Sequence, residues 1–142
     1  MKDIGLTHVA LPVTDVKKSV EFYRNYAGMR VVFRDGSTHW LSDRTRPFVI
    51  VLLEVPEVQC PLRPLGHLGI GVASRAEVDR LAAMAEREGC LASPAKDFGG
   101  YIGYRVFISD PDGHTLEAAY GQEVGLTVEA AGLEAGEPNK GT

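Results

Sequence analysis

Three residues of metal-ligating type stand far apart in the sequence: His8, His67 and Glu117. Two neutral imidazoles and one carboxylate make up the facial triad, which binds a divalent metal ion and leaves coordination positions open for a substrate. Such a triad forms only if all three side chains point into the same space. The elements that carry these residues, and the faces on which they lie, therefore decide the matter.

Glu117 lies on the second limb of a predicted hairpin over residues 105–120. The turn sequence 110–113, Asp-Pro-Asp-Gly, suits a three-residue loop with a left-handed glycine and a G1 bulge. This turn sets Phe107 opposite Glu117, and directly opposite residues share a face. That face is mixed and polar and is expected to line a cleft, whereas the other face is apolar and is expected to pack on a helix.

Each histidine belongs to a segment that alternates like a half-buried strand, residues 6–13 for His8 and residues 65–72 for His67. In both segments one face is apolar and is expected to oppose a helix. The other face carries the histidine, with small residues beside it that leave room for something bulky: Ala10, Gly69 and Gly71. All three candidate ligands thus fall on faces turned away from helices.

The two halves of the chain share an order of elements. Each histidine strand is followed by a helix with a capping residue and a terminal glycine, and then by three strands. The caps are Asp15 and Gly28 in the first half, and Ser74 and Gly89 in the second. This internal repeat predicts an α+β domain over residues 1–121.

The predicted modules span about residues 4–55 and 65–121, joined by a proline-rich linker at 56–64. In the first module the strands after the helix are expected at 29–33, 38–42 and 48–55. Residues 122–142 are dominated by Gly, Ala and Glu without periodicity. They are expected to form a flexible tail, or a strap on a partner subunit.

Composition excludes several classes of partner. A net charge of −4 and a pI near 5.5 argue against nucleic acid or an anionic membrane as the main partner. No apolar run approaches the roughly 20 residues that cross a bilayer, and the first residues lack the apolar core of a signal peptide. Cys60 and Cys90 lie in unlike contexts, so we expect no structural disulfide and a cytoplasmic protein.

Each candidate residue also has an ordinary structural interpretation. A histidine in a strand is often a hydrogen-bonded core residue, and Glu117 can simply pair with Arg105. Arg105 can instead hold a substrate carboxylate or phosphate.

Four further polar or aromatic residues stand in the predicted strands, loops and turns. His39 and Trp40 lie on a strand whose register the sequence leaves open, and they are candidates for substrate binding or for a structural role. Tyr101, in a glycine-rich loop, is a candidate to close over a ligand. His114, at the turn, is expected to be exposed to solvent.

Four segments of the chain resemble the vicinal oxygen chelate superfamily: residues 7–11, 19–23, 66–70 and 110–117. This superfamily includes glyoxalase I, methylmalonyl-CoA epimerase, fosfomycin resistance enzymes, bleomycin resistance proteins and extradiol dioxygenases. The resemblance implies two βαβββ modules whose curled mixed sheets enclose a metal cleft, with ligands at His8, His67 and Glu117. It further implies one divalent ion per chain (Fe, Mn, Ni, Co or Zn) and a homodimer, because cleft-forming modules of this family often come from paired chains.

The sequence departs from each branch of the superfamily. Glyoxalase I and the epimerase carry a fourth ligand where Val51 stands, and Glu54 faces the other way. Extradiol dioxygenases and fosfomycin resistance enzymes have a tyrosine where Phe107 stands; the former also use a histidine that residues 97–105 lack, and the latter an arginine after the last ligand, which is absent here. Bleomycin-binding members usually lack the metal ligands.

The sequence therefore favours a metal-dependent glyoxalase-like enzyme. Its substrate would be a small molecule that chelates the metal through two neighbouring oxygens, with the metal as Lewis acid. Arg105, Phe107, Tyr101, His39 and Trp40 are the candidate substrate contacts, and no catalytic base is evident. The alternatives are an extradiol-type Fe(II) dioxygenase and a drug- or metabolite-binding protein like the bleomycin resistance proteins.

Overall fold

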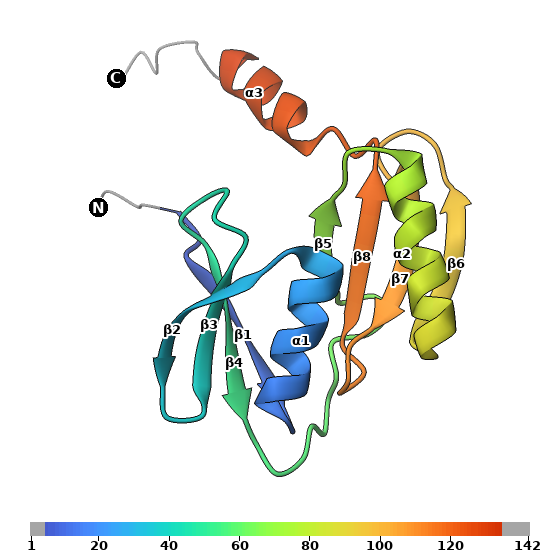
Figure 1. Cartoon of the computed structure of the whole chain (residues 1–142). Helices are drawn as coiled ribbons and strands as arrows, with labels where there is room; N and C mark the ends of the chain where they lie inside the picture. The colour runs from blue at the N-terminus through green and yellow to red at the C-terminus, as the bar shows by residue number, and fades with distance from the viewer. Residues whose placement is uncertain (1–4, 135–142) are drawn as a thin grey trace, which may run out of the picture.

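A computed structural model of the chain describes residues 5–134, which form two four-stranded sheets and three helices (Figure 1). The first module contains β1 (His8–Val13), α1 (Val16–Ala27), β2 (Arg30–Asp35), β3 (Thr38–Ser42) and β4 (Val49–Glu54). The second module contains β5 (Leu68–Gly71), α2 (Arg75–Glu88), β6 (Leu91–Asp97), β7 (Tyr104–Ser109) and β8 (Thr115–Tyr120). A third helix, α3 (Val124–Glu134), follows.

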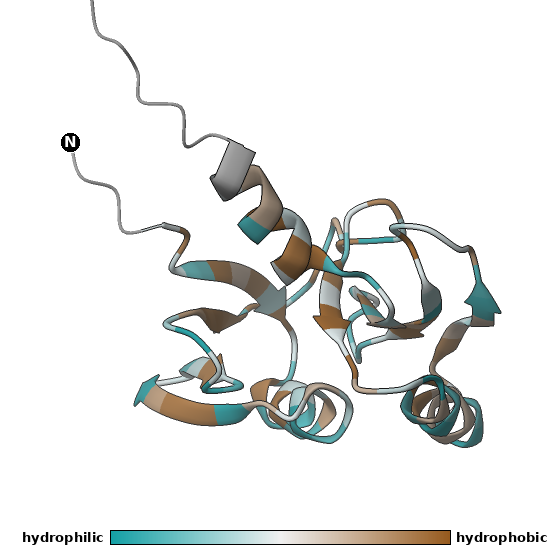
Figure 2. Cartoon of the chain, turned by 90° about the horizontal axis from the view of Figure 1, so that it is seen from above, coloured by the Kyte–Doolittle hydropathy of each residue, from teal (hydrophilic) through white to brown (hydrophobic). Residues whose placement is uncertain are grey.

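The two sheets have the same topology. The strand order is β1-β4-β3-β2 in the first sheet and β5-β8-β7-β6 in the second. In each sheet the first strand runs parallel to the last strand of its module, and the other neighbours are antiparallel. Figure 2 shows α1 and α2 on the same side of the molecule, with α3 on the opposite side. The structure thus confirms an α+β fold of two βαβββ modules, in which neither sheet closes on itself.

Both module helices begin and end where their capping residues predict. The Asp15 carboxylate accepts the backbone N–H groups of Lys17 and Lys18, and Gly28 ends α1 in the left-handed region at φ 63°. The Ser74 hydroxyl accepts the N–H of Glu77 at the start of α2. The Glu77 carboxylate pairs with Arg80 on the surface instead of completing a reciprocal capping box.

The predicted hairpin register is confirmed across β7 and β8. Phe107 pairs with Glu117, and Ser109 with Thr115. Gly113 has φ 88°, as the bulged loop requires. The apolar face of the hairpin lies in the core: Val106, Ile108, Leu116 and Ala118 are each no more than 1% exposed.

The two modules share one hydrophobic core and are joined by polar contacts, one of them buried. The Tyr23 hydroxyl of α1 donates to Asp110 Oδ2 at 2.8 Å, in the turn between β7 and β8. In the same turn Asp112 accepts hydrogen bonds from the hydroxyl and the backbone N–H of Thr14, at 2.6 and 3.1 Å. These contacts hold the end of β1 against the hairpin that carries Glu117.

His114 is not exposed to solvent, so that prediction was wrong. Its side chain is 1% exposed, because the turn folds back against β1 and the linker. Nδ1 accepts the N–H of Leu62 at 2.9 Å, which leaves Nε2 to donate to the carbonyl oxygen of Pro12 at 2.7 Å. His114 therefore joins the linker, β1 and the hairpin.

The segment after β8 contains a helix that the sequence analysis does not predict. Residues Val124–Glu134 form α3, which contacts the Gly-rich loop through a hydrogen bond between Thr127 and Tyr101. The rest of the predicted tail, residues 135–142, lies outside the described residues. No helix of the described residues is long and apolar enough to cross a membrane.

Candidate metal centre

His67 and Glu117, two of the three predicted ligands, are neighbours on the second sheet. His67 directly precedes β5, and the parallel register pairs Leu68 with Leu116 and Gly69 with Glu117. The two side chains meet with His67 Nε2 at 3.3 Å from Glu117 Oε2. The carboxylate is nearly buried, at 5% exposure, whereas the imidazole reaches the surface.

The hydrogen bonds of His67 prepare its other nitrogen to bind a cation. Nδ1 lies 3.0 Å from the carbonyl oxygen of Leu65 and 3.2 Å from that of Pro64. Carbonyl oxygens only accept, so Nδ1 carries the hydrogen and a neutral ring presents its Nε2 lone pair to the Glu117 carboxylate. These two electron-rich groups repel unless a proton or a metal ion lies between them.

This arrangement fits a metal ion. A carbonyl that holds the second nitrogen of a histidine fixes the tautomer and the ring orientation, as is usual for metal-ligating histidines. Two donors bound at about 2.1 Å to one octahedral ion lie roughly 3 Å apart. The 3.3 Å between His67 Nε2 and Glu117 Oε2 is close to that separation.

Two further side chains contact the Glu117 carboxylate. Gln122 Nε2 donates to Oε1 at 2.5 Å, and Arg105 Nε lies 3.8 Å from Oε2. The sequence analysis missed Gln122, because it stands in the segment interpreted as a tail. Its position five residues after Glu117, beyond the end of β8, was the only signal.

Arg105 and Phe107 lie beside the pair, as the face assignment predicts. The Phe107 ring is 5.3 Å from the His67 ring, centroid to centroid. The Arg105 guanidinium lies over two aromatic rings, 3.9 Å from the centroid of Phe107 and 4.2 Å from that of Phe98. The structure thus gathers two predicted ligands, one cation and two aromatic rings on the open face of the second sheet.

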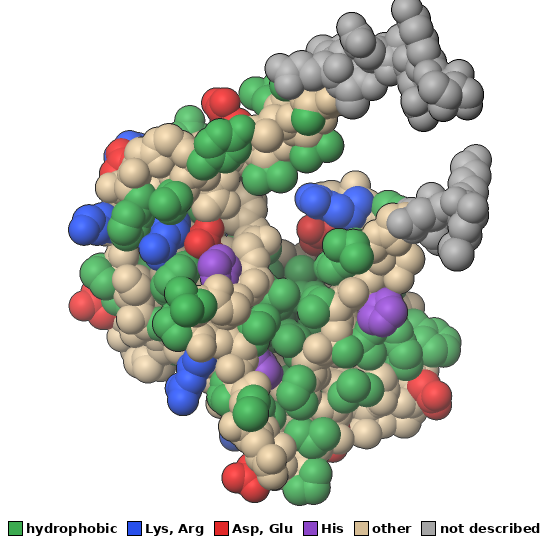
Figure 3. Space-filling model, turned by 180° about the vertical axis from the view of Figure 1, so that it is seen from behind, with side chains coloured by type: hydrophobic (Ala, Val, Ile, Leu, Met, Phe, Trp, Pro, Cys, Tyr) green, Lys and Arg blue, Asp and Glu red, His purple; other side chains and the backbone are tan. Residues whose placement is uncertain are grey.

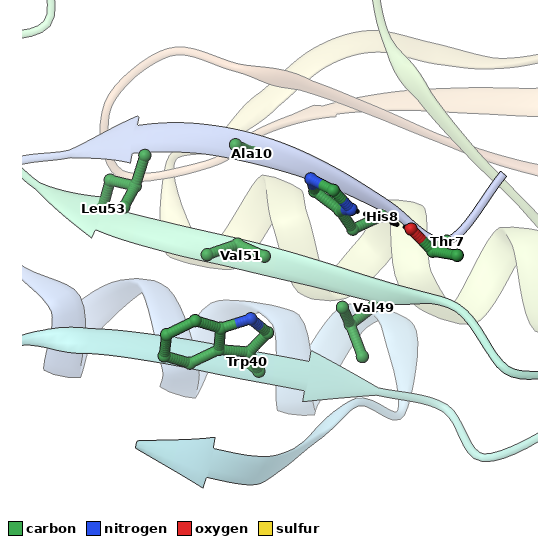
Figure 4. Close-up of a pocket in the computed structure, with 7 residues that line it drawn as sticks. All are labelled: Thr7, His8, Ala10, Trp40, Val49, Val51 and Leu53. Carbon is green, nitrogen blue, oxygen red and sulfur yellow. Dashed lines mark hydrogen bonds between the residues drawn. The ribbon is translucent and has the colours of Figure 1, made fainter. Parts of the chain in front are cut away.

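His8 lies on the open face of the first sheet, at a separate cavity of about 340 Å³. Its Nδ1 lies 2.9 Å from the Thr7 hydroxyl, and its neighbours are otherwise mainly apolar. Figure 4 shows the lining side chains on one face of β1, β4 and β3. They are Thr7, His8, Ala10, Trp40, Val49, Val51 and Leu53.

One chain does not bring the three predicted ligands together. Within residues 5–134, no three or more His, Cys, Asp or Glu side chains are close enough to hold a metal ion. Two predicted ligands meet on the second sheet, and the third stands on the first. Seen from the side away from α1 and α2, both lobes carry charged and histidine side chains, and hydrophobic side chains fill the middle (Figure 3). The triad therefore stays a prediction at this point.

Comparison with known proteins gives the family. The model of the Glyoxalase/Bleomycin resistance protein/Dioxygenase superfamily matches residues 5–118. The chain belongs to this superfamily. The resemblance to the vicinal oxygen chelate proteins is thereby confirmed.

Three relatives illustrate the match. The chain is 33% identical over 132 residues to Uncharacterized protein PA2024 of Pseudomonas aeruginosa, covering 88% of this chain and 94% of that one. A possible glyoxalase from Bacillus cereus has a TM-score of 0.68 and 27% identity, over 82% of this chain and 99% of that one. The fosfomycin resistance protein FosX of Listeria monocytogenes, complexed with Mn(II) and sulfate, has a TM-score of 0.71 and 18% identity, over 92% and 99%.

Val51 is matched in the sequence analysis to the position at which glyoxalase I and methylmalonyl-CoA epimerase carry a fourth ligand. The register pairs Val51 with Ala10 and with Trp40, so it faces the His8 cavity. Glu54 does face away, since its Oε2 accepts the N–H of Val16 at the start of α1. The first sheet therefore offers an imidazole and apolar side chains, but no carboxylate, to this cavity.

The remaining candidate substrate contacts lie in different places in the structure. His39 pairs with Leu52, which is fully buried in the core, so it lies on the opposite face from Trp40. Tyr101 is 69% exposed, and its hydroxyl bonds to Thr127 of α3. Of the substrate contacts predicted from the sequence, only Arg105, Phe107 and Trp40 lie on faces that carry predicted ligands.

Proposed function

We propose that this chain is a metal-dependent glyoxalase-like enzyme whose site is completed between two copies. His67 and Glu117 of one chain and His8 of the other would hold one divalent ion. The observation that carries the proposal is that two atoms able to bind a metal, His67 Nε2 and Glu117 Oε2, face each other at 3.3 Å. The other nitrogen of His67 is held by backbone carbonyl oxygens.

The uncovered face of the first sheet supports assembly from two copies. Phe33 is 61% exposed and packs edge-on against Trp40, and Leu53 is 41% exposed. The registers place these side chains on the His8 face. An apolar sheet face of this kind requires a cover, and the charged face of the second sheet of another copy would supply both the cover and the missing ligands. A twofold axis repeats the contact and produces two identical sites.

The donor set determines the chemistry that the site can support. Two imidazoles and one carboxylate suit Fe, Mn, Ni, Co or Zn, and such an ion acts as a Lewis acid on a substrate that chelates through two neighbouring oxygens. Backbone carbonyls orient His67, and Gln122 holds one oxygen of Glu117. The Mn(II) bound by FosX, which shares this fold, supports a divalent ion here.

The experiment combines metal analysis with mixed variants. Purified protein, stripped and reloaded, should hold about one divalent ion per chain, and His8→Ala, His67→Ala or Glu117→Ala should each lose it. When His8→Ala and Glu117→Ala chains are unfolded together and refolded, half of the dimers are mixed. One site of each mixed dimer is intact, so metal content should recover to about a quarter of the wild-type value.

A second mixture of variants controls for metal binding that returns without a site shared between chains. His67→Ala and Glu117→Ala remove ligands from the same module, so every site of their mixed dimers lacks a ligand and no metal should return. Full metal occupancy in His67→Ala would contradict the triad. Equal failure of both mixtures, or a monomer mass by light scattering at micromolar concentration, would contradict the shared site.

The reaction class needs a separate assay. A Lewis-acid enzyme should work with Zn²⁺, Ni²⁺ or Co²⁺ on an α-oxo or vicinal-diol substrate without O₂. Turnover only with Fe²⁺ or Mn²⁺ and only with O₂ would favour the dioxygenase. Tight binding without turnover under every condition would favour a metabolite-binding protein.

A further inference from the structure

We infer that Arg105 is an anion anchor and that the substrate of this site is an amphipathic anion. This inference rests on the proposed function and specifies its substrate class. The substrate would carry a carboxylate or phosphate-like group for Arg105, two neighbouring oxygens for the metal, and an apolar group for the first sheet. Three features of the described residues support it.

The first feature is the fixed position of the guanidinium. Phe98 and Phe107 each lie within about 4 Å of it, at 4.2 and 3.9 Å to their centroids. Contacts with two ring faces stabilise an arginine and leave the N–H groups at the edge of its plane as the hydrogen-bonding positions. An anion that binds there does not have to order a mobile side chain.

The second feature is unused hydrogen-bonding capacity. The side chain of Arg105 makes no hydrogen bond within residues 5–134. Its Nε lies 3.8 Å from Glu117 Oε2, which is too long for a hydrogen bond. Glu117 already has Gln122 at 2.5 Å and His67 at 3.3 Å. Pairing with Glu117 alone therefore does not account for the five donors of this guanidinium.

The third feature is the difference in charge between the open face of the second sheet and that of the first sheet. On the second sheet, the Lys96 ammonium lies 5.2 Å from the centroid of Phe98, the ring that also contacts Arg105. Phe98 thus has two cations around it, one of which lies 3.8 Å from the Glu117 carboxylate, and a divalent ion would add to the positive charge. On the first sheet, the cavity is lined by Trp40, Val51 and Leu53 beside His8, with no charged side chain. The face of the second sheet therefore suits an anion, and the cavity on the first sheet suits an apolar group.

A matched pair of probes tests the inference. The acid 3,4-dihydroxyphenylacetate carries neighbouring oxygens, an aromatic ring and a carboxylate, and its methyl ester lacks only the charge. Binding is measured by calorimetry and by the fluorescence of Trp40, the single tryptophan of the chain. Both probes are titrated into metal-free and Zn²⁺-loaded protein.

We expect the wild-type protein to prefer the acid, and Arg105→Met to lose that preference, with acid affinity falling about 10- to 100-fold and ester affinity little changed. Arg105→Lys keeps the positive charge but loses the planar guanidinium with its paired N–H groups, so it should retain part of the preference for the acid. Arg75→Met is the control, because Arg75 also contacts an aromatic ring, Tyr104, and pairs with Asp97 away from the site. It should bind both probes like wild type.

Equal wild-type affinity for acid and ester would overturn the inference, as would an acid preference that survives in Arg105→Met. A folded Arg105→Gln variant, checked by circular dichroism, serves if the methionine variant does not fold. Metal content separates this inference from the proposed function. Protein that binds no metal yet prefers the acid refutes the metal site alone, whereas metal-loaded protein without the preference refutes the anion anchor alone.

Discussion

Tyr23→Phe tests the buried hydrogen bond that joins the two modules. Tyr23 is fully buried, and its hydroxyl donates at 2.8 Å to Asp110, which is 4% exposed. The substitution leaves a buried carboxylate oxygen without its donor. Hydrogen bonds to charged groups contribute about 1.5–3 kcal/mol to the free energy of unfolding. In a domain of this size that loss lowers Tm by roughly 5–10 °C.

The loss should depend on pH, because burial raises the pKa of Asp110 although hydrogen bonds from Tyr23, His114 and Asp112 lower it. An acid whose pKa is raised on folding favours the folded state below its ordinary pKa, and this contribution is lost as pH rises through the raised value. Tyr23→Phe removes one of the lowering bonds and raises the pKa of Asp110 further. Its cost is therefore full at neutral pH and shrinks as pH falls through the raised pKa.

The assay is urea denaturation between pH 4 and pH 8. Tyr104→Phe is the matched control, because the Tyr104 hydroxyl donates to the Asp79 carboxylate at the protein surface. We expect that control to unfold close to wild type at every pH. A Tyr23→Phe protein that is as stable as Tyr104→Phe, or that loses the same free energy at every pH, would refute the reasoning.

Two pairs of substitutions test the packing and the local backbone, each measured by urea denaturation. Leu52→Ala, in the fully buried core, should cost about 2–5 kcal/mol, whereas Leu6→Ala, at 89% exposure, should cost a small fraction of that. Gly103→Ala should cost more than Gly36→Ala: both glycines have positive φ, but only at Gly103 would the new Cβ meet the backbone oxygen of Tyr120. Gly36→Ala alone should cost about 1 kcal/mol, and an equal cost for the two would contradict the predicted clash.

The features that the sequence predicts well are local ones. Asp15 and Gly28 bound α1 because capping depends on residues a few positions away. The β7–β8 register follows from the turn at 110–113, so the face of Glu117 was predictable. The sequence does not predict where the strand after α2 begins and ends, because β6 contains Pro94 and its pairing with β7 shifts register.

The features that the sequence does not predict depend on how distant elements meet. Alternation places His8 and His67 on open faces, but it does not say which sheets face each other. His114 looks like an exposed turn residue until the turn packs on the end of β1. His39 and Trp40 are separated only by the pairing of β3 with β4. Gln122 contacts Glu117 because the chain bends back beyond β8.

The parallel strand in each module has a consequence for how the protein folds. His8 pairs with Val49 and Leu68 with Leu116, so each sheet is completed only when about forty or more intervening residues have been brought together. Hairpins and helices need only local contacts and form early, whereas such distant pairings form late. β1 and β5 stand at the sheet edges: β1 carries His8, and β5 directly follows His67, the two histidines proposed as metal ligands. We therefore expect these histidines to reach their places in the last steps of folding, so that a partly folded chain has its helices and hairpin but no metal affinity.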